Sequence, residues 1–66
     1  MAAFDRGDRV VATKDLGGGL FTAVPKGTRG EVIRVDESWT GSVTFTVRFE
    51  NDKIEEVKEN GLYRDR

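Results

Sequence analysis

Carboxylates are the side chains of this 66-residue chain that come nearest to a catalytic arrangement. The chain has no His and no Cys, so acid–base chemistry would fall to carboxylates, lysines and one Tyr. Glu55 and Glu56 are adjacent, and in the strand expected there their side chains point to opposite faces and cannot share a proton. A solvated sheet edge is the commoner place for such charges. The sequence therefore predicts a protein that is not an enzyme.

Metal and phosphate sites are not expected either. Without His and Cys the best ligands for zinc are missing, and Asp5, Asp8 and Asp15 lack the spacing of a calcium-binding loop. The glycine triplet at 17–19 has neither the spacing nor the following helix of a nucleotide-binding loop, so it is interpreted as a flexible loop tip. We expect no cofactor and no metal ion.

Apolar side chains in loops are the residues that favour binding. Trp39, the only tryptophan, lies among polar residues, and Leu20 and Phe21 follow the glycine triplet. Rigid rings in loops anchor many protein interfaces, because they desolvate a large area at little entropic cost. Two roles are open for Trp39: an anchor for a partner protein, or a lid folded back over the open end of a small core.

Nucleic acid is the second class of partner that the residues allow. Arg34 and Arg48, with Thr44 and Thr46, would lie on an outward sheet face, helped by Lys53. However, 11 basic residues stand against 12 acidic ones, the net charge is -1, and both signs are scattered along the chain. A basic footprint is the usual mark of nucleic-acid binders, so the charge balance favours an unidentified protein partner.

The elements expected to position these residues are short strands, because no window shows helical spacing of apolar residues. The clearest alternation puts Val43, Phe45, Val47 and Phe49 on one face of a half-buried strand. The expected elements are strands over 7–13, 29–36, 42–49 and 53–57, a connection over 14–26, a polar loop over 37–41, a tight hairpin turn around Asn51 and Asp52, a helical turn over 58–61 and a short last strand beginning at Tyr63.

Two details of the expected strands bear on the core. Strict alternation in the second strand puts Val32 on one face and Ile33 and Val35 on the other, so both sets reach the core only if the strand bends or bulges. In the first strand, Val10 and Ala12 share one face. Val11 is expected on the opposite face, outside or at a partner's surface.

The size of the chain limits how it can be stabilised. Residues 1–66 are expected to form one domain, and without disulfides its stability has to come from packing or association. Five short strands in so few residues are expected to close on themselves. The N-terminus has no apolar run of signal-peptide length, and no segment approaches the roughly 20 apolar residues of a membrane span, so we expect a cytoplasmic protein.

Laid out in this way, the chain resembles an SH3-like barrel over nearly all of its length. The resemblance rests on the first strand at 7–10, the long loop to Pro25, the Gly-Thr-Arg-Gly-Glu-Val run at 27–32, the hairpin at 51–52 and the one-turn helix. The run at 43–49 is similar to the third strand of small accessory subunits, such as the photosystem I peripheral subunit and the variable chain of ferredoxin-thioredoxin reductase. It implies an all-β fold, a small five-stranded SH3-like barrel with a one-turn helix before the last strand.

The resemblance also implies where a partner would bind. In SH3-like barrels the first long loop and the loop before the third strand lie side by side, so Leu20, Phe21 and Trp39 would share one partner-binding surface with Tyr63. Signatures of proline-rich peptide recognition are missing at 12–16 and 58–60. KOW and Tudor-type barrels share the Gly-rich start of the second strand, which implies nucleic-acid binding as the alternative. The self-assembling plasmid dihydrofolate reductase is a second alternative, although its Val-Gln-Ile-Tyr signature has no equivalent at 43–46.

Overall fold

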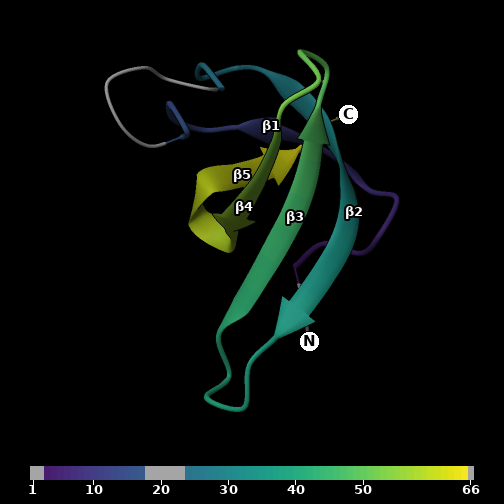
Figure 1. Cartoon of the computed structure of the whole chain (residues 1–66), viewed down its shortest axis with the longest axis vertical. Helices are drawn as coiled ribbons and strands as arrows, with labels where there is room; N and C mark the ends of the chain where they lie inside the picture. The colour runs from purple at the N-terminus through teal and green to yellow at the C-terminus, as the bar shows by residue number, and fades with distance from the viewer. Residues whose placement is uncertain (1–2, 18–23, 66) are drawn as a thin grey trace.

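The computed structural model, which describes residues 3–17 and 24–65, contains one antiparallel sheet and a single turn of 3-10 helix (Figure 1). This confirms the expected all-β class and the helical turn before the last strand. The elements are β1 (Arg9–Ala12), β2 (Arg29–Glu37), β3 (Val43–Phe49), β4 (Ile54–Lys58), η1 (Glu59–Gly61) and β5 (Leu62–Arg64).

The five strands follow the order β4-β3-β2-β1-β5 across the sheet. Among the described residues no ladder joins the two outer strands, β4 and β5, which are connected along the chain by η1. The sheet is therefore open, and its closure into a barrel stays a prediction. In the β3–β4 turn, Asp52 has a φ of 66°, and this left-handed conformation is one that Asp tolerates in tight hairpins.

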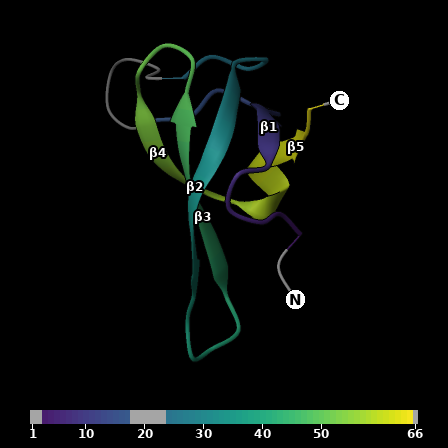
Figure 2. The same ribbon diagram turned by 90° about the vertical axis from the view of Figure 1, so that its right-hand side faces the viewer.

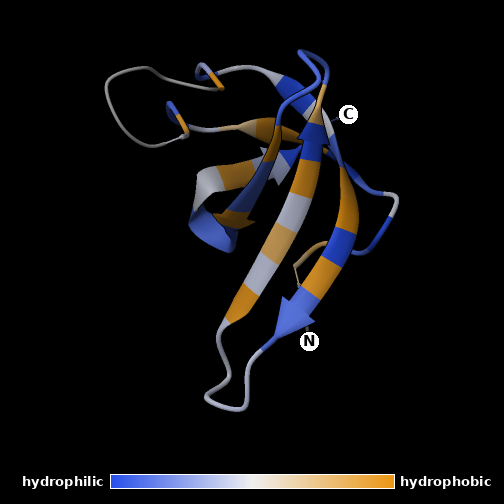
Figure 3. Ribbon diagram, viewed as in Figure 1, coloured by the Kyte–Doolittle hydropathy of each residue, from blue (hydrophilic) through white to orange (hydrophobic). Residues whose placement is uncertain are grey.

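The core lies on the inner face of β3, as its alternation predicts. Figure 3 shows apolar and polar positions alternating along this strand. Phe45, Val47 and Phe49 are buried, while Arg48 between them is exposed. The buried core cluster consists of Phe4, Val10, Ala12, Val24, Val32, Phe45, Val47, Phe49, Val57 and Leu62.

A bulge in β2 resolves the conflict in that strand. Val32 pairs with Val47 but Arg34 pairs with Thr46, so Ile33 is an extra residue on its strand. The shift returns Val35 to the inner face, where it packs against the core, and leaves Ile33 exposed. The predicted bend or bulge is confirmed.

Val11 is buried, with 5% of its surface exposed, so its expected place on the outside was wrong. It lies opposite Arg29 on β2 and opposite Tyr63 on β5. Cross-strand neighbours on one face touch, and the stem of an arginine can cover apolar surface. The two long side chains therefore account for its burial on the face away from the core.

The N-terminal segment contributes a core residue that the sequence did not indicate. Phe4 is buried and meets Phe45 edge to face, with 5.3 Å between ring centroids. Arg64 holds this segment: its guanidinium lies 5.8 Å from the centre of the Phe4 ring, and its Nη2 donates a hydrogen bond to the carbonyl of Ala3 at 3.4 Å. Arg64 Nη1 also forms an ion pair with Asp8 at 3.4 Å.

Candidate partner-binding site

Trp39 lies in the loop between β2 and β3, and backbone hydrogen bonds define its position. The N–H of Ser38 donates to the carbonyl of Ser42 at 2.8 Å, and the N–H of Gly41 donates to the carbonyl of Ser38 at 3.0 Å. Gly41 has a φ of 90°. A three-residue hairpin loop that ends in a left-handed Gly is a common solution for this connection. The tip is therefore an ordered turn, and we call residues 36–43 the arm.

The Trp39 side chain points into solvent. It is 96% exposed, the highest exposure of the large apolar side chains in the described residues. Figures 1 and 2 both show the arm extending beyond β1, β4 and β5. The interpretation of Trp39 as a lid over the core is therefore wrong, because the ring contributes almost nothing to the interior.

Tyr63 lies on β5, where it borders a second apolar feature. The side chain is 52% exposed. It lines a groove of about 670 Å³ between the N-terminal segment, η1 and β5, which we call the η1 groove. The carbonyl of Asn60 accepts a hydrogen bond from Thr13 Oγ1 at 3.1 Å, which ties η1 to the end of β1. The groove is lined by Ala3, Phe4, Lys58, Glu59, Asn60, Leu62, Tyr63 and Arg64.

Trp39 and Tyr63, the two predicted binding residues that the structure describes, do not share one surface. In both views the arm lies at one end of the molecule, and the described ends of the connection, 14–17 and 24–28, lie at the other. The bridge between Leu16 and Val24 closes the base of that connection. Leu20 and Phe21 lie outside the described residues. The side-by-side placement of the two loops therefore stays a prediction, whereas Trp39 and Tyr63 belong to separate features.

The candidate nucleic-acid face carries both signs of charge. Arg34 and Arg48 do lie on adjacent strands, but Arg34 Nε is bound to Asp36 Oδ1 at 2.9 Å and Arg48 lies opposite Glu31. Thr46 is flanked by Arg34 on one side and by Glu56 on the other. Thr44 lies between Asp36 and Lys58, and Lys53 precedes β4 in the β3–β4 turn. These positions do not form the single-sign surface that phosphate backbones select.

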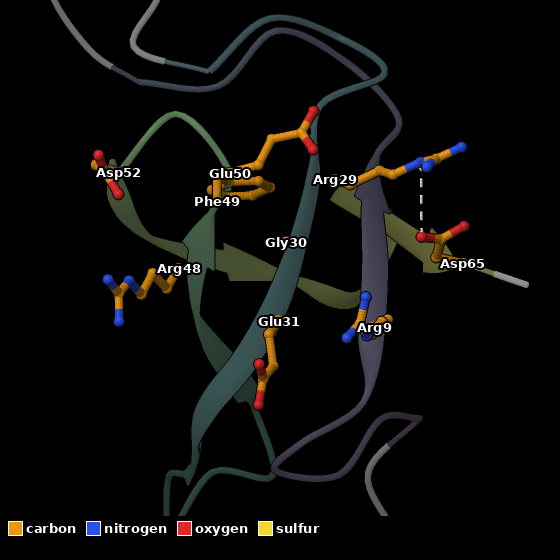
Figure 4. Close-up of a pocket in the computed structure, with 9 residues that line it drawn as sticks. All are labelled: Arg9, Arg29, Gly30, Glu31, Arg48, Phe49, Glu50, Asp52 and Asp65. Atoms are coloured by element: carbon orange, nitrogen blue, oxygen red, sulfur yellow. Dashed lines mark ion pairs between the residues drawn. The ribbon is translucent and has the colours of Figure 1, made fainter.

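A charged hollow of about 430 Å³ lies over Gly30, on the outer side of β1, β2 and β3 (Figure 4). Arg29 Nε and Asp65 Oδ2 approach to 3.7 Å across one side of it. Arginines and carboxylates alternate around its rim, so it favours neither anions nor cations. The sequence pattern gave no signal of this hollow, which is lined by Arg9, Arg29, Gly30, Glu31, Arg48, Phe49, Glu50, Asp52 and Asp65.

Two further findings concern residues 3–17 and 24–65. They contain no cluster of three or more His, Cys, Asp or Glu side chains placed to hold a metal ion. Within the same residues, no helix has the length and apolar character needed to cross a membrane.

Comparison of the chain with protein-family models, with curated proteins and with solved structures gives no match. What the protein binds therefore has to be inferred from its own surface.

Proposed function

We propose that this protein is a small, non-catalytic interaction module or accessory subunit of the cytoplasm, built on an SH3-like barrel, that binds a partner protein through exposed aromatic side chains. Trp39 and Tyr63 are the described anchors, and Leu20 and Phe21 complete the predicted set. The exposure of Trp39, 96% at the tip of an ordered arm, is the observation that carries this proposal.

The energetic argument concerns what the Trp39 ring can gain on binding. A large aromatic side chain buries about 150–250 Å², which at about 25 cal/mol per Å² corresponds to roughly 4–6 kcal/mol before the costs of association. In the free protein almost none of this surface is buried. The hydrogen-bonded turn between Ser38 and Ser42 also holds the tip in place, so few rotatable bonds of the loop would lose their freedom on binding.

Two features support the barrel part of the proposal. The 3-10 turn at Glu59–Gly61 stands directly before β5, and the tight turn at 51–52 joins β3 to β4, as the resemblance implies. The sheet is open between β4 and β5, and η1 connects these two strands along the chain.

Trp39→Ala is expected to weaken partner binding strongly and to leave the fold intact. Exposed surface substitutions change stability by about 0.5 kcal/mol or less, whereas loss of an interface anchor costs about 2 kcal/mol or more, roughly a 30-fold loss of affinity. The measurement is capture of the partner from native cell extract on immobilised protein, with thermal unfolding followed by circular dichroism.

Ile54→Ala is the matched control, because Ile54 is an exposed apolar residue, 55% exposed, on the outer strand β4. It should retain the partner. Undiminished capture by Trp39→Ala, or equal loss in both variants, would contradict the proposal. Binding of labelled DNA or RNA that weakens steeply with added salt would instead favour the nucleic-acid alternative.

A further inference from the structure

The N-terminal residues 3–8, which we call the strap, form a small turn with hydrogen bonds of its own. The N–H of Asp8 donates to the carbonyl of Asp5 at 3.0 Å, and the N–H of Asp5 donates to Asp8 Oδ2 at 2.9 Å. Gly7 has a φ of 96° inside this turn, a left-handed conformation that glycine adopts without strain. These bonds lie within the strap, so it can keep its shape when it moves away from the sheet.

Backbone hydrogen bonds join the strap to the sheet at one place on β2. The N–H of Gly7 donates to the carbonyl of Val32 at 2.7 Å, and the N–H of Val32 donates to the carbonyl of Asp8 at 2.9 Å. Both bonds lie just beyond Arg9, where β1 begins. Their loss would free the strap and leave β2 paired with β3 and β1 paired with β5.

Side chains also hold the strap against the sheet, and Arg64 on β5 supplies three of their contacts. Its guanidinium lies 5.8 Å from the centre of the Phe4 ring, its Nη2 donates to the carbonyl of Ala3, and its Nη1 pairs with Asp8. One side chain therefore reaches both ends of the strap. The side chains of Arg64 and Asp8 are 58% and 25% exposed, so water competes for these bonds.

The strap covers a side of the core where the sheet is open. Among residues 3–17 and 24–65, no ladder joins β4 to β5. Figure 2 shows the strap passing beside η1 and β5, and its residues Ala3 and Phe4 line the η1 groove together with Leu62. Phe45, which is 0% exposed, meets the Phe4 ring from within the core. Release of the strap would remove one wall of the groove and uncover Phe45.

We propose that the strap is a lid that opens and closes over Phe45 while the sheet stays folded, and that Arg64 is the side chain that keeps it closed. Segments with few buried contacts and exposed hydrogen bonds open more readily than the core of the same protein. Phe4 is the only buried residue of the strap. The lid lies outside the predicted set of binding residues, so the inference does not depend on the proposed function.

Native-state hydrogen exchange, followed by NMR at several low urea concentrations, tests the lid. The amides of Gly7 and Val32 are the reporters, because their hydrogen bonds join the strap to β2. We expect both to show the same opening equilibrium constant, larger than that of the β3 amides, and little dependence on urea, because opening exposes little surface. Val32 is the sharper reporter, since its residue is 0% exposed and yet its amide should exchange with the strap.

Arg64→Gln tests the residue that keeps the lid closed. The opening constant of the Gly7 and Val32 amides should rise about tenfold, the effect of losing one charge-assisted hydrogen bond, and its weak dependence on urea should remain. Arg48→Gln is the matched control, because Arg48 is an exposed arginine on β3. It should leave the opening constant unchanged. If circular dichroism shows that Arg64→Gln is unfolded, Arg64→Lys replaces it, since lysine keeps the charge but loses the planar guanidinium.

Three results would overturn the inference. If the Gly7 and Val32 amides share the opening constant and the steep urea dependence of β3, the strap opens only when the whole chain unfolds. If the two amides differ in their opening constants, the strap does not move as one piece. If the Arg64 variant changes the opening constant no more than Arg48→Gln does, Arg64 does not keep the lid closed. None of these results bears on partner binding through Trp39.

Discussion

Phe45→Ala should leave the chain largely unfolded at room temperature. Phe45 is 0% exposed at the centre of β3, and its ring meets that of Phe4 at a centroid distance of 5.3 Å. Truncation of a buried Phe to Ala costs about 3–5 kcal/mol, because the apolar burial is lost and the cavity does not fully collapse. A domain of this size without disulfides or other cross-links has a total free energy of unfolding of about 3–5 kcal/mol. Urea unfolding followed by circular dichroism measures the loss.

Phe45→Leu is the matched control, because it keeps an apolar side chain and removes less volume. It should lose less stability and still unfold cooperatively.

Phe4→Ala separates the aromatic contact from burial, since an edge-to-face pair contributes about 0.5–1.5 kcal/mol beyond its area. A double-mutant cycle with Phe45→Leu measures that coupling. A Phe45→Ala chain that unfolds at nearly the same urea concentration as the original would show that the core lies elsewhere.

The strands that the sequence predicts best are those whose own pattern decides their structure. Val43 to Phe49 alternates without interruption, and β3 has its inner and outer faces where that alternation puts them. The bulge at Ile33 was also predictable, because Val32 and Val35 both need the core and only an extra residue puts them on the same face.

Features that depend on distant parts of the chain were not predictable in the same way. Phe4 is a single aromatic in a polar segment and has no periodic neighbours. Its burial depends on Phe45 and on Arg64, which bonds to Ala3 across 61 positions of sequence. Val11 is covered by residues of two other strands, so its own strand pattern could not reveal its burial.

The site was predicted in its residue types but not in its layout. An isolated loop Trp is consistent with a lid and with an anchor, and only the 96% exposure of Trp39 in the folded chain distinguishes the two. Of the expected common surface, Trp39 and Tyr63 lie apart because β2 runs for 9 residues, to Glu37. At about 3.3 Å per residue, this length carries Trp39 far from the opposite end of the sheet. Strand length rather than residue type therefore separates the candidate anchors.

Gly30→Ala should destabilise the protein by about 2–3 kcal/mol, although it adds a single methyl group. The new Cβ would lie 2.7 Å from Val47 Cγ1, 2.9 Å from Phe49 Cδ1 and 2.9 Å from the backbone oxygen of Arg48. The last contact cannot be relieved by a rotamer change, because Gly30 pairs with Phe49 and Glu31 with Arg48 in the central ladder. The melting temperature should fall by about 4–8 °C for each kcal/mol lost.

Gly61→Ala tests whether the neighbouring backbone is the cause. Its added Cβ would lie 2.7 Å from Val57 Cγ1, a side-chain atom, and its other near neighbours are side-chain atoms at 3.8 Å. A side chain can turn or shift where a paired strand cannot, so this variant should lose clearly less stability. Equal losses in thermal unfolding would mean that crowding of side chains, and not the approach of β3 to β2, makes glycine necessary at position 30. In that case a larger residue could be accommodated by repacking Val47 and Phe49, and the close spacing of the two central strands would not depend on Gly30.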